Sequence, residues 1–315
     1  MRRKNLNKPN VLKIGTRDSQ LATWQAQFVS ERLKENHNPA ELVFVKTEGD
    51  LTLDTPLTEM GGKGVFTKAL DEVLLDGRID LAVHSFKDIP TILPAGLKVA
   101  AVLKREDPRD VIVTRKGTDF LDDSEYEAVV ATSSNRRKSQ WLSRYPKHRI
   151  TDIRGNVNTR LRKVRENEWD AAIFAAAGLK RINLDDKIDQ YLEWMIPAPA
   201  QGAMAVMIRE DNKQLQKVLS KLDHRETRIC TTIERDFLYM MEAGCSAPVA
   251  AYARIVDGMI QLKASVLMID GSERYDIEDA IVVENSEGMG VQAASEVLKR
   301  GADKIIKLLS KKKAL

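Results

Sequence analysis

Short apolar runs alternate with amphipathic stretches in the first part of the chain. Residues 11–15, 41–47 and 80–86 are apolar runs of strand length, and residues 19–34 and 66–75 carry apolar side chains at helical spacing. Strand and helix alternating in this order predict a parallel sheet with helical crossovers. Because ligands of such sheets bind beyond the carboxyl ends of the strands, the residues that follow each strand are the first candidates for a site.

A second block repeats this order of elements without repeating the sequence. The connections near 103–109 and 195–203 are rich in proline with charge or with alanine, and they are candidate hinges. The elements predicted between them are strands at 127–134 and 149–155, helices at 135–145 and 156–169, and a strand or buried turn at 171–179.

From about residue 223 the pattern changes. A predicted helix over 226–242 precedes three predicted strands, and two Asp-Gly pairs between those strands are strong hairpin signals. A last helix is expected over 289–309, with lysines near its C-terminus. This part of the chain reads as a separate α+β domain. The three strands are expected at 249–256, 258–269 and 274–283.

Length and charge narrow the classes of protein. A chain of 315 residues predicts two or three domains. Fifty basic against forty-six acidic residues leave a net charge of +4, which argues against a dedicated nucleic-acid binder, although a local basic cleft can exist within such a total. Two cysteines and four histidines exclude a disulfide scaffold and give little material for a zinc site. No apolar run is long enough for a signal peptide or a membrane span, so a soluble cytoplasmic protein is expected.

Arginines recur at the predicted ends of strands. Arginine suits bidentate recognition of carboxylate or phosphate, and hydroxyl side chains at 132–134 begin a predicted helix, where anions bind. The pattern therefore favours an anionic ligand, while solvent-exposed helix faces remain the alternative for any single arginine. The loop at 61–64 lacks the spacing of a phosphate loop. The arginines are Arg17, Arg136, Arg137, Arg154, Arg160 and Arg181.

Two further places in the sequence are candidates for chemistry. Lys87 and Asp88 follow an apolar strand, and a carboxylate there could stabilise a cationic intermediate or could simply shape the turn before a proline. Cys245 lies in a loop of small residues, where a thiol can serve as a nucleophile or as an attachment point. Cys230 lies on a helical face and is expected in the core.

Ten short motifs, taken in order, give the chain its resemblance to a known family. The sequence resembles the porphobilinogen deaminase family, also called hydroxymethylbilane synthases, along nearly its whole length. The motifs are IGTRDSQLA (14–22), TEGD (47–50), GGKGVF (61–66), AVHSFKDIP (82–90), REDPRD (105–110), TSSNRR (132–137), RGNVNTR (154–160), AAGLKR (176–181), PAQGA (199–203) and AGCSAP (243–248).

The resemblance implies an α/β fold with two domains like those of periplasmic binding proteins, a cleft between them, and a small C-terminal α+β domain. Domain 1 is then discontinuous, with residues 1–103 and 200–222. Domain 2 spans 104–199, and domain 3 spans 223–315 and carries the cofactor-attachment cysteine.

The resemblance also implies the reaction. A dipyrromethane cofactor, one per chain, is bound through a thioether to Cys245 and primes the stepwise condensation of four porphobilinogen molecules. Four ammonia molecules leave, and hydrolysis frees the linear hydroxymethylbilane. Each pyrrole brings an acetate and a propionate, so the growing chain is polyanionic, which accounts for the arginines.

The resemblance assigns roles residue by residue. Asp88 is the catalytic residue, facing the pyrrole nitrogens and stabilising positive charge, and Lys63 and Phe66 belong to a loop over the cleft. A monomer that binds porphobilinogen, and that binds no nucleic acid, membrane or metal, is expected. Binding of cofactor and substrate carboxylates falls to Arg17, Ser19, Lys87, Ser134, Arg136, Arg137, Arg154, Arg160 and Arg181.

Two alternatives come from other classes of protein. A solute-binding protein of the same two-lobed fold would use the strand-end arginines but gives no role to Cys245 or to a third domain. A nucleic-acid binder would use the basic runs at 135–138 and 160–165, but only Trp141 and Trp169 lie near them as stacking platforms.

Overall fold

A computed structural model describes residues 11–46, 67–241 and 248–311 of the chain. The chain divides into two compact units, of which the first contains Met1–Leu103 and Met204–His224 and the second contains Lys104–Ala203 and Arg225–Leu315. The finer division into three domains at residues 103, 199 and 222 stays a prediction.

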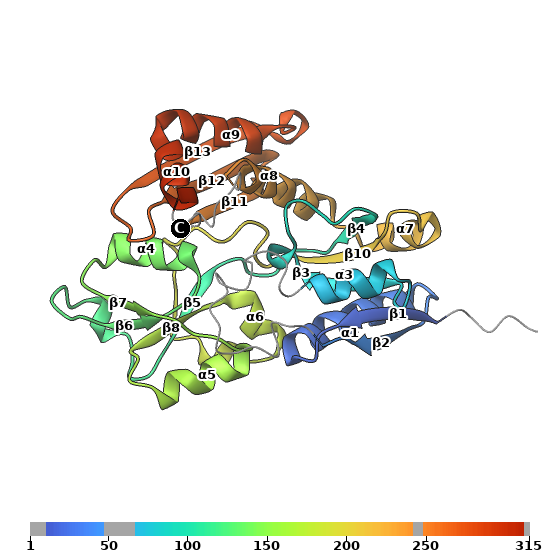
Figure 1. The fold of residues 1–315 in the computed structure, drawn as a ribbon, viewed down its shortest axis with the longest axis horizontal. Coiled ribbons are helices and arrows are strands. Elements are labelled where there is room, and N and C mark those ends of the chain that lie inside the picture. Colours follow the sequence, from blue (N-terminus) through green and yellow to red (C-terminus); the bar gives the residue numbers. More distant parts are fainter. Residues whose placement is uncertain (1–10, 47–66, 242–247, 312–315) are drawn as a thin grey trace, which may run out of the picture. The chain divides into compact units, whose positions relative to one another are not determined.

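The first unit is built on a mixed five-stranded sheet (Figure 1). Its first three strands along the chain run parallel, as the alternation of strand and helix predicts. The sheet is extended by two strands that the sequence did not indicate, and β10 is antiparallel to both of its neighbours. The strand order is β2 (Ala40–Phe44), β1 (Leu12–Thr16), β3 (Leu81–Ser85), β10 (Met204–Arg209) and β4 (Leu97–Val102).

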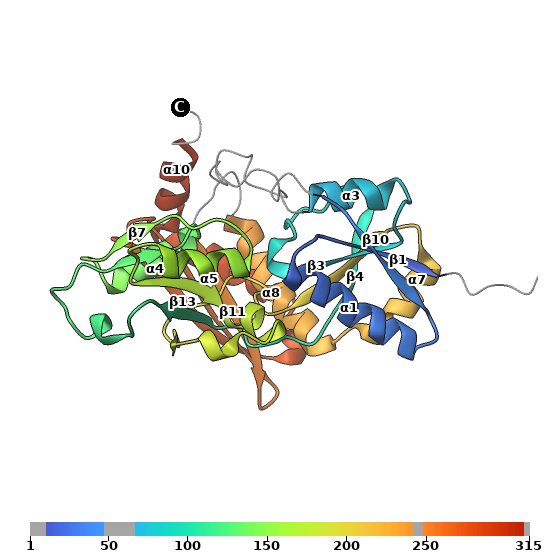
Figure 2. The same cartoon turned by 90° about the horizontal axis from the view of Figure 1, so that it is seen from below.

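Helices cover both faces of this sheet (Figure 2). Helix α1 (Gln20–Glu35) and helix α7 (Lys213–Leu219) bury apolar side chains against one face, while α3 (Lys68–Leu75) lies on the other. Gly15 in β1 lets α3 approach, because a Cβ there would lie 2.9 Å from Leu70 Cδ2. Short 3₁₀ turns, η1 (Phe86–Asp88) and η4 (Ser220–Leu222), follow β3 and α7.

The second unit contains another five-stranded mixed sheet. Three of its strands are parallel, and β5 pairs antiparallel with β8 and β9, so this sheet repeats the pattern of the first. The residues of the expected strand or turn at 171–179 form a strand followed by a helix. The strand order is β7 (Arg149–Thr151), β6 (Val129–Ala131), β8 (Ala171–Ala175), β5 (Asp110–Thr114) and β9 (Gln190–Tyr191).

Helices again lie on opposite faces of this second sheet. Helix α4 (Asn135–Arg144) buries Trp141 against one face, and α5 (Val157–Glu166) buries Leu161 and Val164 against the other. The shorter elements of this part are α6 (Ala176–Arg181) and the 3₁₀ turns η2 (Asp119–Leu121) and η3 (Asp185–Lys187).

The second unit also holds a three-stranded antiparallel sheet with helices packed on it, as predicted (Figure 1). The expected final helix over 289–309 is interrupted by a π-type turn, η6 (Leu298–Ala302), where Gly301 has φ +122°. The elements are α8 (Arg225–Met241), β11 (Val249–Val256), β12 (Met259–Leu267), β13 (Arg274–Val282), η5 (Val283–Asn285), α9 (Met289–Val297) and α10 (Asp303–Lys311).

Candidate active site

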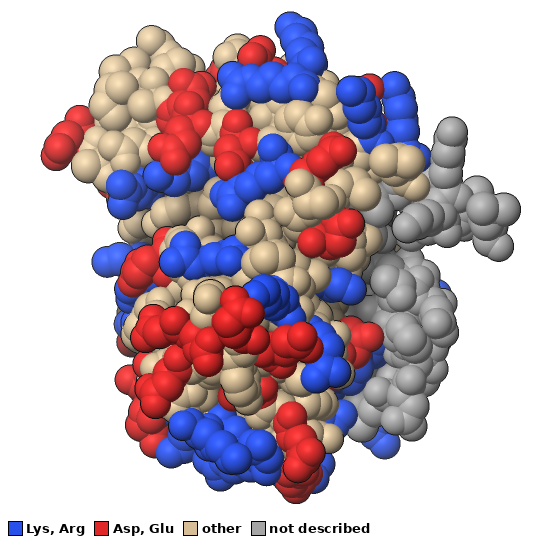
Figure 3. Space-filling model, turned by 90° about the vertical axis from the view of Figure 1, so that its left-hand side faces the viewer, with Lys and Arg blue, Asp and Glu red and all other residues tan. Residues whose placement is uncertain are grey.

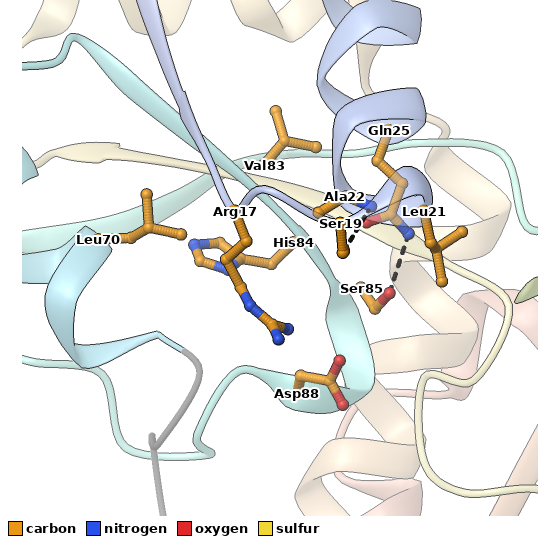
Figure 4. A pocket seen from close by; sticks show the side chains of 10 residues that line it. All are labelled: Arg17, Ser19, Leu21, Ala22, Gln25, Leu70, Val83, His84, Ser85 and Asp88. Atoms are coloured by element: carbon orange, nitrogen blue, oxygen red, sulfur yellow. Dashed lines mark hydrogen bonds between the residues drawn. The ribbon is translucent and has the colours of Figure 1, made fainter. Parts of the chain in front are cut away.

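A pocket opens in the first unit where β1 and β3 end and α1 begins (Figure 4). Its cavity volume is about 70 Å³, several times the space that one water molecule needs. The pocket can therefore receive a small polar group. It is lined by Arg17, Ser19, Leu21, Ala22, Gln25, Leu70, Val83, His84, Ser85 and Asp88.

Local backbone structure places the polar side chains of this pocket. Ser19 is the N-cap of α1, and its Oγ accepts a hydrogen bond of 3.3 Å from the backbone N–H of Ala22. After β3 the chain turns through η1, with Phe86 and Ile89 buried on either side of Asp88. These two anchors leave the Asp88 carboxylate exposed at the pocket.

Arg17 and Asp88 are the single cation and the single anion among the described residues that line the pocket. Arg17 follows β1 and Asp88 ends η1, so the two charges come from neighbouring parallel strands. The structure thus brings together three sequence-predicted residues, Arg17, Ser19 and Asp88. A guanidinium can bind a carboxylate while a nearby carboxylate stabilises positive charge.

Three polar residues of the pocket were not predicted from the sequence. Gln25 is buried on α1, and its side-chain N–H donates to Ser85 Oγ at 2.9 Å (Figure 4). A polar residue four positions after Leu21 on an apolar helix face was the available signal for Gln25. His84 and Ser85 lie at the end of an apolar strand and gave no such signal.

In the second unit, Arg136 and Arg137 converge on one buried carboxylate. Asp110 is fully buried, and it accepts hydrogen bonds from Arg136 Nη1 at 2.7 Å and from Arg137 Nε at 2.9 Å. Gln201 Nε2 donates to the same carboxylate at 3.1 Å. Ser134 is the N-cap of α4, with its Oγ 3.5 Å from the backbone N of Arg137. Asp110 was not predicted as a site residue, because it stands at the start of an apolar strand.

The remaining arginines lie at two other places in this unit. Arg154 follows β7, and Arg160 on α5 donates from Nε to the Gly155 carbonyl at 2.7 Å. Arg181 ends α6 and donates from Nη2 to the Gly202 carbonyl at 2.6 Å. Burial lowers the pKa of Arg181 to about 10, so its guanidinium stays charged at neutral pH.

The remaining residues singled out from the sequence do not line the pocket or lie outside the described part of the chain. Lys87 is half-buried in η1 and is not among the residues that line the pocket. Cys245, Lys63 and Phe66 lie outside the described residues. Cys230 is buried in the core beneath the three-stranded sheet, and burial raises the pKa of its thiol to about 11.

Three further observations concern surface charge, membrane-spanning helices and metal-binding groups among the described residues. On the face shown in Figure 3, Lys and Arg side chains lie among Asp and Glu side chains, so the charges are not separated by sign there. Within residues 11–46, 67–241 and 248–311, no helix is long and apolar enough to span a bilayer. The same ranges hold no group of three or more His, Cys, Asp or Glu side chains placed to bind a metal ion.

Similarity to known proteins covers most of the chain. The family model described as "Porphobilinogen deaminase, dipyromethane cofactor binding domain" matches residues 12–217, and "Porphobilinogen deaminase, C-terminal domain" matches residues 228–299. A porphobilinogen deaminase of Chlorobium phaeobacteroides (strain BS1) is 42% identical over 302 residues, which are 93% of this chain and 96% of the relative.

Solved structures match at lower similarity. A double mutant of the BvgS VFT2 domain of Bordetella pertussis has a TM-score of 0.43 at 16% identity, covering 67% of this chain and 86% of that one. An ancestral cationic amino acid solute-binding protein has a TM-score of 0.42 at 14% identity, covering 67% and 87%. The two family models and the 42% identical relative decide the assignment. The chain belongs to the porphobilinogen deaminase family.

Proposed function

We propose that this chain catalyses the head-to-tail condensation of four porphobilinogen molecules, with release of ammonia at each step and of linear hydroxymethylbilane by hydrolysis. The main support for this proposal is the pocket, which is lined by both Arg17 and Asp88 and lies inside the region matched by the cofactor-binding family model. Porphobilinogen carries carboxylates and loses an amine, so its chemistry requires a cation for binding and an anion for catalysis. The pocket offers one of each.

The residues of this pocket fit a dipyrromethane cofactor. His84 Nε2 is buried and has no hydrogen-bond partner among the described residues, so a bound polar group can satisfy it. Arg17 supplies a binding partner for a carboxylate, and we propose Cys245 as the covalent attachment point. When bound, the dipyrromethane supplies the pyrrole carbon to which the first porphobilinogen is joined.

Asp88 supports the step in which charge develops. As ammonia leaves porphobilinogen, the remaining pyrrole becomes positively charged, and a fixed carboxylate stabilises that charge without reorganising. Phe86 and Ile89 hold the turn that presents Asp88, so the anion is in place before the substrate arrives. Arg17 meanwhile holds a carboxylate of the bound pyrroles.

The arginines of the second unit are proposed to bind further carboxylates. Asp110 fixes Arg136 and Arg137 in one orientation, and the carbonyls of Ile196 and Ile173 accept a further hydrogen bond from Arg136 and Arg137 respectively. Their positions are therefore set before a ligand binds, which reduces the entropy lost on binding. We propose the same binding role for Ser19, Lys87, Ser134, Arg154, Arg160 and Arg181.

Three further features are proposed on the family's pattern. Lys63 and Phe66 are assigned to the family's cleft loop, and the chain works as a monomer in the cytoplasm without a metal. Residues 223–315 form a third domain that carries Cys245.

Replacement of Asp88 tests the catalytic role. Asp88→Asn should keep the fold and the covalent cofactor mass while turnover falls about 10²- to 10³-fold, because one electrostatic stabiliser is lost. Release of ammonia from porphobilinogen measures turnover. The matched control is Asp18→Asn, an exposed carboxylate outside the pocket lining, which should keep turnover within about threefold. Unchanged turnover in Asp88→Asn would falsify the role.

Intact-protein mass spectrometry tests the attachment point. The wild-type protein and Cys230→Ala should carry the extra mass of a dipyrromethane, and Cys245→Ala should lack it. Stepwise heavier species should follow addition of porphobilinogen to the wild type. An adduct that survives on Cys245→Ala contradicts the assignment of the cysteine, and an unmodified wild type that releases no ammonia contradicts the proposed reaction.

A further inference from the structure

His84 is a buried imidazole in the wall of the Arg17–Asp88 pocket. It lies in β3 between Val83 and Ser85, whose side chains point toward α1, so strand alternation turns His84 toward the opposite face, where α3 lies. Only 6% of the residue is exposed. Figure 4 shows it among the residues that line the pocket.

The His84 ring has an unmet hydrogen bond. Its Nε2 is buried and has no partner in the described part of the chain. Buried polar groups in folded proteins nearly always have a partner, and an unmet one lowers stability. The adjoining cavity of about 70 Å³ has room for the missing group.

The pocket keeps this imidazole uncharged at neutral pH. Burial, followed by the nearby positive charge of Arg17, lowers the pKa of His84 to about 4. The other charged side chain in the pocket is Asp88, and α3, whose Leu70 lines the pocket, also carries the buried carboxyl of Asp71. A neutral imidazole carries one N–H donor, so His84 can add a hydrogen bond without adding a second cation beside Arg17.

We propose that His84 is a positioning residue that donates a hydrogen bond from Nε2–H to the same pyrrole-side-chain carboxylate that Arg17 binds. A carboxylate has about four lone-pair sites, so it can accept from Arg17 and His84 together. Two donors, one on β3 and one directly after β1, fix its orientation more fully than one donor does. This inference rests on the proposed function of the pocket, and the carboxylate belongs either to porphobilinogen or to the dipyrromethane.

Two substitutions separate positioning from packing. His84→Leu removes the polar atom and leaves an apolar side chain, so the Tm of the purified protein should stay the same or rise. Loss of a hydrogen bond to a charged group should raise KM for porphobilinogen about 10- to 100-fold, with kcat changed less than about threefold. His84→Gln keeps an N–H donor and should restore KM to within about fivefold of wild type.

His148 provides the matched control. It is also 6% exposed, and burial lowers its pKa, but its Nδ1 accepts a hydrogen bond of 3.1 Å from Trp141 Nε1. His148→Leu leaves the Trp141 N–H group buried without an acceptor, so this substitution should lower Tm and leave KM unchanged. His84→Leu is thus expected to change KM without lowering Tm, and His148→Leu is expected to lower Tm without changing KM.

The covalent cofactor mass, measured together with KM, shows which molecule carries the carboxylate. If it belongs to porphobilinogen, His84→Leu raises KM while the covalent cofactor mass is fully retained. If it belongs to the dipyrromethane, the fraction of protein carrying that mass falls while KM holds. An unchanged KM together with full cofactor loading overturns the proposal, and so does a fall in Tm like that of His148→Leu without a change in binding.

A direct measurement does not depend on the variants. In wild-type protein labelled with ¹⁵N-histidine, the Nε2 resonance of His84 should show an attached proton and shift on addition of porphobilinogen. If the resonance shows that Nε2 carries no proton, this nitrogen is a hydrogen-bond acceptor, and the proposal that it donates is overturned. Ammonia release by the same sample tests the proposed function separately, so failure of one is distinguishable from failure of the other.

Discussion

Replacing Glu234 by glutamine should destabilise the second unit strongly. Glu234 on α8 is fully buried and accepts hydrogen bonds from Arg105 Nη1 at 2.8 Å and Nη2 at 2.6 Å. Its two oxygens also accept from the backbone N–H groups of Ala200 and Ala253, both at 2.7 Å. One carboxylate therefore joins the segment after residue 104, the loop at 200 and strand β11.

The size of the effect follows from these four bonds. Glutamine keeps one acceptor oxygen and turns an NH₂ group toward donors, so about two charge-assisted bonds are lost at about 1.5–3 kcal/mol each. Breaking a buried ion pair by removing one partner costs about 3–5 kcal/mol, because the remaining guanidinium stays buried without its partner. We expect about 4 kcal/mol for Glu234→Gln.

Urea unfolding followed by far-UV circular dichroism measures this loss, and thermal unfolding should show a Tm lower by roughly 8–16 °C. The control is Glu166→Gln, which removes an exposed pair with Arg162 on α5, where both side chains are at least 50% exposed. Such a pair contributes about 0.5 kcal/mol or less. Equal losses in the two variants would refute the reasoning.

The double variant Arg105→Met/Glu234→Gln sharpens the test. It leaves no buried charge and keeps an amide oxygen that can accept from a backbone N–H group, so part of the stability lost in Glu234→Gln should return. If the double variant loses as much as the two single changes added together, the two side chains are not coupled, and the ion pair is not the source of the effect.

Two other changes test the packing of each unit. Burial raises the pKa of Asp71 on α3 to about 6, so the folded state holds this proton more tightly than the unfolded state, and stability falls as pH rises from about 4 to about 6. Asp71→Asn should therefore raise Tm at pH 7.5 and give little gain at pH 4, and a gain that is independent of pH would contradict this cause. Gly290→Ala places a Cβ 2.1 Å from the Ile233 carbonyl oxygen, so separation of α8 and α9 should cost about 1–3 kcal/mol in urea unfolding. An unchanged midpoint would show that the two helices can move apart freely.

Hydrophobic periodicity was enough to locate most helices and strands. Ser19 marks the start of α1, and Asp-Gly marks the turn between β11 and β12, because caps and hairpins are set by neighbouring residues. Strand β10 was not predicted, because its pairing partners β3 and β4 lie more than a hundred residues earlier. Local patterns carry no information about such pairings.

The candidate site could be predicted in part from the sequence. Arg17 and Asp88 follow from the rule that ligands bind at strand ends, Ser19 was assigned through the family resemblance, and all three line the pocket. His84 could not be predicted, and the helix pattern around Gln25 was only a weak signal, because a polar residue inside an apolar run shows neither its burial nor its hydrogen bonding. Those properties arise only when α1, α3 and β3 pack together.

The position of β10 between β3 and β4 also sets an order of events during synthesis on the ribosome. The chain emerges from its N-terminus, and among the described strands β4 pairs only with β10, which does not exist until residues 204–209 have been made. All five strands of the second sheet are complete by Tyr191. The nascent N-terminal unit must therefore wait with an unpaired edge on β3, exposed to pairing with other chains, while the sheet encoded after it can already close.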